Sequence, residues 1–314
     1  DYLDGTNIGG SSFVAHVNHA ASAIHAGLCS TALVLYGSTA ASNSMAIGTG
    51  GTGASKDPGL AFTAPYGMTT VGSYAMYANL HMQTYGTTSE QLAQIAVTMR
   101  QHAGLNPLAK MRAPITVDDV LESRMISRPL HLLDCCIISD GGGAVIVTSL
   151  ERAKDLRSQP VSLLGCGEAV QHQGVGDSDL LTIAAKQSGS TAMKMAGIKH
   201  ADIDLAMIYD SFTITVLATL ENLGFCEPGD GGDFVGDGGI AIGGLLPVNP
   251  DGGGLSSNHP GMRGIFLVIE AVKQLRGECG ERQVKDARVA LAHGTGGTIG
   301  DKHSGATLIL GVDR

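Results

Sequence analysis

The chain has 314 residues, of which 43% are hydrophobic and 16% charged, and its formal net charge is −9. An acidic balance without a lysine- and arginine-rich run argues against nucleic-acid and anionic-membrane binding, because both need a concentrated basic patch. No apolar stretch reaches the roughly 18 residues that a membrane span needs. We therefore expect a soluble globular enzyme, with no nucleic-acid partner and no membrane span.

The cysteines and histidines show no metal-ligand spacing. Six cysteines lie at positions 29, 135, 136, 166, 226 and 279 without a C-x-x-C pair, which indicates reduced cytoplasmic thiols. His16 and His19 are three residues apart, but no third ligand is spaced to join them, so packing is the expected role and no metal is predicted. The opening, Asp1 to Gly5, resembles the middle of a domain, and we expect that an N-terminal part precedes it.

The first predicted elements form one structural unit. Apolar residues at helical spacing predict a helix over Ala15–Ala26 that ends at Gly27, followed by a strand over Ala32–Gly37. An inserted loop region, residues 42–127, follows, with one long amphipathic helix at Ser89–His102, and an insertion of this size usually covers or lines a site. The unit closes with a strand at Ala144–Thr148.

The second half repeats this pattern, which indicates duplication. Its predicted elements, in chain order, are Val161–Leu164 (strand), Leu180–Ala196 (helix), Leu205–Ile208 (strand), Ile265–Leu275 (helix), Val289–Ala292 (strand) and Ala306–Leu310 (strand). Continuous apolar strands that alternate with helices predict parallel or mixed sheets covered on both faces. We therefore expect an α/β protein with halves at 1–155 and 156–314, stacked as a five-layered α/β/α/β/α sandwich.

Chemistry in open α/β sheets concentrates where strands end and helices begin. Four segments qualify: Gly9-Gly10-Ser11, Tyr209-Asp210-Ser211-Phe212, Asn258-His259-Pro260 and His293-Gly294. Two further motifs are weaker. Gly48 to Gly53 fits G-x-G-x-x-G, but no strand leads into it, which favours a loop. Cys135 and Cys136 are neighbours that would point to opposite faces of a strand, which favours two packed thiols.

The segments Asn249–Leu255, His259-Pro260-Gly261, Gln274–Glu278 and Arg282-Gln283-Val284 resemble the thiolase superfamily in its sterol-carrier-protein branch. The resemblance implies the thiolase fold with duplicated βαβαβαββ halves, and a coenzyme A thioester as substrate rather than a permanently bound cofactor. It also implies that His259 donates to the thioester oxygen. The Tyr209 and His293 segments are similar to the family's H-D-C-F and H-N-x-G-x-G-G, and the residues implied as substrate contacts are Ser211, Asn258, Gly296 and Gly297.

The departures from the family are informative. Its nucleophilic cysteine falls at about Gly10, its second cysteine at Ser211, and its histidine of H-D-C-F at Tyr209. Neither Ser11 nor Ser211 has an evident base beside it in sequence, so thiolytic chemistry is not expected. The chain resembles the CoA-ester aldolases of steroid side-chain degradation, which lack these cysteines and pair with a zinc-ribbon/OB-fold partner protein.

That resemblance implies a retro-aldolase, a carbon–carbon lyase that cleaves a β-hydroxyacyl-CoA into a ketone and a short acyl-CoA. Catalysis is assigned to Tyr209 with Asp210 beside it for proton transfer, His259 as oxyanion donor, and His293 as a second donor or acid/base. Two alternatives stay open: an acyltransferase with a non-standard nucleophile, and a noncatalytic subunit that binds acyl-CoA or lipid. A homodimer in the cytoplasm is also implied. Tyr209 at a strand end and His293 before a glycine turn also suit purely structural roles.

Overall fold

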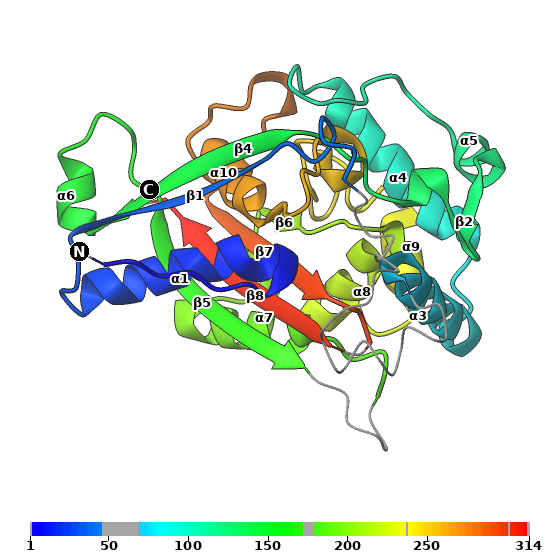
Figure 1. The fold of residues 1–314 in the computed structure, drawn as a ribbon, viewed down its shortest axis with the longest axis horizontal. Helices are drawn as coiled ribbons and strands as arrows, with labels where there is room; N and C mark the ends of the chain where they lie inside the picture. The colour runs from blue at the N-terminus through cyan, green and yellow to red at the C-terminus, as the bar shows by residue number, and fades with distance from the viewer. Residues whose placement is uncertain (1, 46–68, 172–178, 237, 301, 313–314) are drawn as a thin grey trace.

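The computed structural model describes residues 2–45, 69–171, 179–236, 238–300 and 302–312. It contains two main sheets (Figure 1). In the first, β1 (Thr31–Ser38) pairs antiparallel with β4 (Gly141–Thr148). The second has the order β5-β8-β7-β6, in which β6 and β7 are parallel and the other pairs antiparallel. Its strands are β5 (Ser162–Gln171), β6 (Leu205–Ile208), β7 (Val289–Gly297) and β8 (His303–Gly311).

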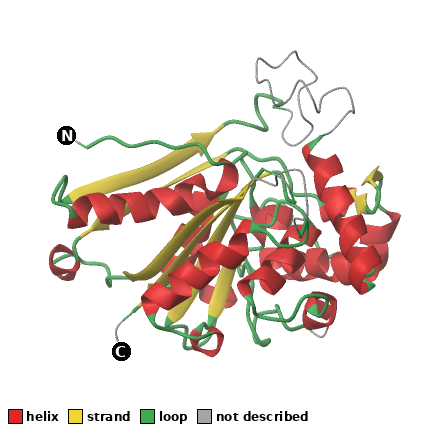
Figure 2. Ribbon diagram, turned by 90° about the horizontal axis from the view of Figure 1, so that it is seen from below, coloured by secondary structure: helices red, strands yellow, loops and turns green. Residues whose placement is uncertain are grey.

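Two helices lie between the sheets, α1 (Ser12–His25) and α10 (Gly264–Leu275) (Figure 2). They are apolar because both sheets pack on them, and one cluster joins Val17 of α1, Val34 of β1, Val268 of α10 and Leu308 of β8. On its other face the larger sheet is covered by α7 (Ala184–Ala196), beside which α8 (Thr213–Leu223) packs. Four layers of the expected sandwich are thus present in the described ranges.

The outer face of the smaller sheet is uncovered in the described part of the chain. Leu33 and Leu35 of β1 are 60% and 61% exposed, and Ile146 of β4 is 67% exposed. The inward residue Val34 is 7% exposed, as the alternation of a strand requires.

The inserted region is more helical than the sequence predicts. The expected amphipathic helix is present as α4 (Ser89–Gly104), which begins with a capping box between Thr88 and Gln91. It is accompanied by α3 (Thr70–Tyr85) and α5 (Val117–Glu122), so the prediction of one helix was wrong. Gly48 to Gly53 lies outside the described residues. The remaining short elements are β2 (Met125–Ser127), β3 (Leu130–His131), α6 (Leu150–Lys154) and α9 (Gly231–Gly236).

Two boundaries differ from prediction for local reasons. The helix α7 begins at Ala184 instead of Leu180, because Thr182 N–H and its hydroxyl both bond to Asp179 in a turn. The strand β7 does not stop at Ala292 but continues through the glycine-rich segment to Gly297, where it pairs with His303 of β8. This continuation fixes which face each residue of that segment occupies.

Candidate active site

The candidate site lies where α1 and α10 begin beside the ends of β6 and β7. Glycines allow the close approach: a Cβ on Gly264 would lie 2.5 Å from the Gly10 carbonyl oxygen, and one on Gly294 would lie 2.8 Å from the Ser11 Cα. The N-termini of two buried helices, of 14 and 12 residues, therefore meet at one point. Helix N-termini carry partial positive charge, which suits a site where an oxyanion develops.

Tyr209, the first residue after β6, meets His259 at this junction. The Tyr209 hydroxyl lies 2.9 Å from His259 Nε2 and accepts a hydrogen bond of 3.2 Å from the Arg263 backbone N–H. Its oxygen is also 3.4 Å from the Gly261 carbonyl. Both side chains are buried, with exposed fractions of 3% each. The structure thus brings together the two residues to which the sequence assigns the central chemistry.

Both partners are neutral at pH 7. Burial raises the pKa of Tyr209 far above its ordinary value of 10. Burial, helped by the nearby Arg263 cation, lowers the pKa of His259 to about 4. The Nδ1 atom of His259 is buried without a hydrogen-bond partner among the described residues. A neutral hydroxyl thus faces a neutral imidazole, an arrangement in which one proton can pass between them.

These two side chains border a pocket of about 410 Å³. Ser211, Gly296 and Gly297, predicted as substrate contacts, also line it. Most of its other wall is apolar and includes Val71, Ile126, Leu132, Ile138 and Phe212. A volume of this order is within the range of small-molecule sites.

Cys135 and Cys136 both line the pocket, which corrects the prediction that they point to opposite faces. They lie outside the named strands, so strand alternation does not apply to them; Cys135 makes a single bridge to Phe212. Burial raises the pKa of Cys135 to about 12 and that of Cys136 further. Neither is a thiolate at neutral pH, so neither is a ready nucleophile.

Asp210 belongs to the scaffold of the site. It is fully buried, does not line the pocket, and accepts hydrogen bonds of 2.6 and 3.1 Å from the Gly254 and Leu255 backbone N–H groups. Burial raises its pKa to about 6, although the Arg263 cation acts in the opposite direction. The predicted catalytic residue Asp210 thus lies beneath the pocket, where its carboxylate binds the backbone of the Gly254–Leu255 turn.

Arg263 anchors the turn that carries His259. Its side chain is fully buried and forms an ion pair with Asp251, while its Nε lies 4.0 Å from Asp210 and donates to the Asn258 carbonyl at 3.1 Å. The Asn258 side chain donates to Ser257 and is not among the pocket-lining residues, so the predicted substrate contact at Asn258 is not placed at the pocket.

The N-terminal half holds His259 through two residues that the sequence analysis missed. The His259 backbone N–H donates to Ser139 Oγ at 2.9 Å, and the Ser139 N–H donates to the His259 carbonyl at 3.3 Å. Tyr36 of β1 donates its hydroxyl to the Pro260 carbonyl at 2.6 Å and accepts from Met262 N–H at 3.1 Å. These contacts join segments more than 100 residues apart, and no local sequence pattern announces them.

His293 lies away from the pocket. Its Nδ1 is 2.8 Å from Thr307 Oγ1, which is 3.0 Å from Ser188 Oγ of α7, so its ring points to the α7 face of the sheet. Its backbone carbonyl accepts from Tyr209 N–H, but its side chain is not among the pocket-lining residues. The continuation of β7 causes this, because it sets His293 on the face opposite Gly294, which packs on α1.

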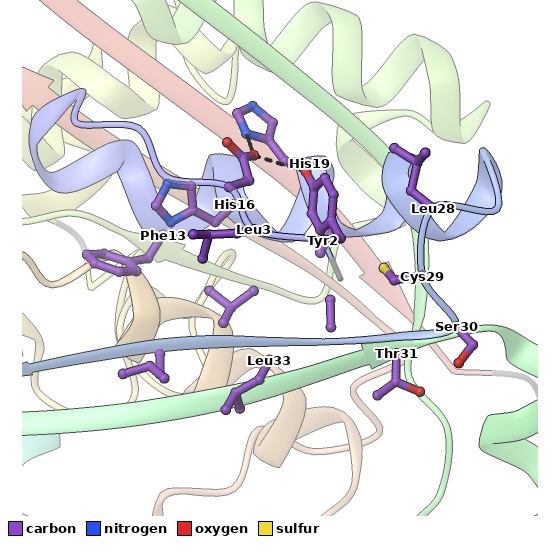
Figure 3. A pocket seen from close by; sticks show the side chains of 15 residues that line it. Tyr2, Leu3, Phe13, His16, His19, Leu28, Cys29, Ser30, Thr31 and Leu33 are labelled. Atoms are coloured by element: carbon purple, nitrogen blue, oxygen red, sulfur yellow. Dashed lines mark hydrogen bonds and ion pairs between the residues drawn. The ribbon is translucent and has the colours of Figure 1, made fainter.

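A second cavity, of about 690 Å³, lies between α1, β1 and the N-terminal segment (Figure 3). His19 there is 2.9 Å from Asp4 and 3.2 Å from Glu168, while His16 accepts from Thr6 N–H. No group of three or more metal-ligating side chains occurs within the ranges that the structure describes. Over those same ranges, no helix is both long and apolar enough to cross a membrane.

This geometry agrees with comparisons to known proteins. The family described as thiolase C-terminal domain-like matches residues 167–312. The chain is 37% identical over 324 aligned positions to the steroid side-chain-cleaving aldolase of Thermomonospora curvata, covering 98% of this chain and 79% of that protein. The chain therefore belongs to the thiolase superfamily.

Within the superfamily, two further relatives are informative. The solved structure of the Ltp2-ChsH2(DUF35) aldolase superimposes with a TM-score of 0.86 at 36% identity, covering 98% of this chain and 79% of that one. The acetyl-CoA acetyltransferase of Methanothermobacter thermautotrophicus is 41% identical over 240 residues, which is 76% of this chain and 63% of the relative. The chain thus spans less than two thirds of that acetyltransferase.

Proposed function

We propose that the protein is a carbon–carbon lyase, a retro-aldolase that cleaves a β-hydroxyacyl-CoA thioester into a ketone and a shorter acyl-CoA. The observation that carries the proposal is the contact between the Tyr209 hydroxyl and His259 at a pocket whose predicted nucleophile position is Gly10. A retro-aldol cleavage needs a proton acceptor for the hydroxyl and stabilisation of an enolate, but no covalent acyl-enzyme. Likeness to two aldolases supports the same reaction class.

In the proposed reaction, the Tyr209 oxygen takes the proton of the substrate β-hydroxyl while the Tyr209 proton passes to His259 Nε2. The bond between the α and β carbons then breaks, the β carbon becomes the ketone carbonyl, and the electron pair moves into a thioester enolate. The proton held by His259 returns through Tyr209 to the α carbon. The substrate thus loses one proton from its β-hydroxyl, and the acyl-CoA product gains one proton at its α carbon. No co-reactant is needed.

The enolate oxygen is stabilised by the two helix N-termini that meet beside Tyr209. The buried Arg263 cation favours the proton relay, because it lowers the cost of negative charge that develops on the neighbouring Tyr209 oxygen. The sequence analysis instead assigned His259 as the oxyanion donor. His259→Gln separates the two roles, because glutamine keeps an N–H donor but cannot hold the proton. If His259 is part of the proton relay, the variant should lose turnover. If His259 is only an oxyanion donor, the variant should keep it.

The acyl group that we propose is bulky and apolar, a steroid side-chain ester. The apolar pocket wall formed by Val71, Leu132 and Phe212 supports such a group, and the name of the Thermomonospora relative agrees. Coenzyme A enters as part of the substrate.

The test is to incubate the protein with a branched β-hydroxyacyl-CoA of a steroid acid and, separately, with a β-ketoacyl-CoA plus free CoA, and to follow the products by mass spectrometry. We expect a ketone and a short acyl-CoA from the first substrate, and loss of both products in Tyr209→Phe. Thiolytic cleavage of the second substrate alone would contradict the proposal. Binding of both esters without turnover would favour the noncatalytic carrier.

Acyl transfer is the second candidate, favoured by the 41% identity to an acetyltransferase and by the two cysteines in the pocket. Its difficulty is that burial raises the pKa of both thiols. Intact-mass analysis after exposure to acyl-CoA decides it: an acyl adduct that Cys136→Ser removes would support acyl transfer.

For the assembly we propose a cytoplasmic homodimer that works with a zinc-ribbon/OB-fold partner. The six cysteines, all free in the described residues, support a reducing compartment. The paired name of the Ltp2-ChsH2(DUF35) aldolase supports a partner protein. Light scattering of the purified chain, alone and with a co-encoded zinc-ribbon protein, tests both: a monomer with no added mass would contradict them.

A further inference from the structure

A side chain at residue 10 would occupy the space that the aromatic ring of Tyr209 fills. A Cβ built on Gly10 would lie 2.3 Å from Tyr209 Cε2 and 2.4 Å from Tyr209 Cζ, well inside any real carbon–carbon contact. It would also lie 2.5 Å from the Thr295 carbonyl oxygen. Tyr209 is 3% exposed and packs in the core between the sheets, so the only space into which the ring could retreat is the pocket that it borders.

The backbone itself does not require glycine at this position. Gly9, its neighbour, has φ of +67°, in the left-handed region where glycine is favoured, but Gly10 is not among the residues with positive φ. An alanine would therefore be tolerated by the backbone dihedrals of Gly10. What excludes a side chain is the volume occupied by Tyr209 and by the β7 carbonyl.

We infer that Gly10 is the positioning residue that admits Tyr209 to the site, and that a side chain at residue 10 and a working tyrosine at residue 209 exclude each other. This inference rests on the proposed function and deepens it. With glycine at residue 10, the Tyr209 ring reaches across the start of α1, and its hydroxyl meets His259 Nε2 at 2.9 Å. With a nucleophile-bearing side chain at residue 10, the ring would have to leave, and the hydroxyl with it. The pair of residues thus sets the class of reaction that the pocket performs.

The steric part is tested by a double-mutant cycle on stability, using Gly10→Ala, Tyr209→Ala and the double variant. In the wild-type background Gly10→Ala should lower the melting temperature by roughly 5 °C or more. In the Tyr209→Ala background two of the three closest contacts are removed and the Thr295 carbonyl oxygen remains, so the loss should be smaller. Equal losses in the two backgrounds would overturn the inference, whether or not the protein is an aldolase.

The catalytic part is tested with the β-hydroxyacyl-CoA substrate. Gly10→Ala should lower kcat by about 10²- to 10⁴-fold, as expected when a general acid–base is displaced, with KM changed only a few-fold. The matched control is Gly165→Ala in β5, whose Cβ would lie 2.2 Å from the Ala192 carbonyl oxygen of α7, a comparable crowding remote from the pocket. That control should lose stability and keep its kcat. A folded Gly10→Ala variant with wild-type kcat would overturn the inference.

Discussion

The helices α1 and α10 begin at corresponding places in the two halves, but the side chains at their starts differ. The start of α1 is Gly9-Gly10-Ser11, and at Gly10 it presents no side chain. The start of α10 follows a turn that carries His259 and Arg263, both buried and both in contact with Tyr209. Of the two helix N-termini that meet at the site, the α10 start therefore carries the groups to which we assign the chemistry.

The N-terminal half contributes space and support. Gly10 leaves room for the Tyr209 ring, while Ser139 and Tyr36 hold the His259 turn by hydrogen bonds. The Tyr209 hydroxyl and the His259 imidazole, which we propose to be catalytic, both come from the C-terminal half. A change in the C-terminal half should therefore alter the reaction itself, whereas the supporting bonds from the N-terminal half should have smaller effects.

The same substitution made in each half is the strongest test of this division. Tyr209→Phe removes the hydroxyl that bonds to His259, and kcat should fall by about 10²- to 10⁴-fold. Tyr36→Phe removes the hydroxyl that bonds to the Pro260 carbonyl and the Met262 N–H, and kcat should fall by no more than about 30-fold, since each of the two hydrogen bonds contributes about 1 kcal/mol. Steady-state kinetics on both variants makes the comparison. Similar losses would show that the halves share the chemistry.

Removing the buried Arg263 cation beneath the start of α10 should have an effect nearly as large as that of Tyr209→Phe, but on the free energy of unfolding instead of kcat. Arg263→Met leaves Asp251 and Asp210 buried without their counter-charge, and breaking a buried ion pair costs about 3–5 kcal/mol. Adding Asp251→Asn should recover part of the loss, because one uncompensated charge is removed. Urea unfolding of the single and double variants measures the loss and the recovery of stability. A double variant less stable than Arg263→Met would rule out this electrostatic account.

Sequence reasoning succeeded where the pattern is local. The strand β6 and the helix α10 match their predicted ranges to within one residue, since both are apolar runs bounded by turns. The helix α8 was missed because all but one of its eleven residues are buried, which leaves no amphipathic period.

Within the site, Tyr209 and His259 could be predicted because each stands in a segment similar to a family motif. The placement of the Asp210 and His293 side chains could not, since it depends on which face of a strand or turn each side chain takes. Asp210 points into the scaffold beneath the pocket, and His293 points to the α7 face. Ser139 acts through a contact 120 residues along the chain.

The buried histidines should make the stability of the protein depend on pH. Burial lowers the pKa of His303 and His259 to about 4 and that of His293 to about 3, below the unfolded value of about 6.5. Between these values the unfolded chain binds more protons, so the stability present above pH 6.5 should be lost as pH falls towards 4.

His303→Asn keeps an acceptor for the Ala184 N–H and should reduce the pH slope by up to about 1.4 kcal/mol per pH unit. Urea unfolding at several pH values between 4 and 7 gives the slopes. An unaltered slope in His303→Asn would exclude this histidine as a source of acid lability.

The smallest effect should come from the bond that crosses between the halves at Ser139. Ser139→Ala leaves the buried backbone N–H of His259 without its acceptor, while the bond from Ser139 N–H to the His259 carbonyl survives. One such bond contributes about 1 kcal/mol, so stability should fall by that amount and kcat by about fivefold. Ser139→Thr, which retains the hydroxyl, should restore kcat if the extra methyl is accommodated. A loss of kcat as large as that of Tyr209→Phe would move Ser139 from the supporting half into the reaction itself, because a positioning contact cannot cost as much as the group that it positions.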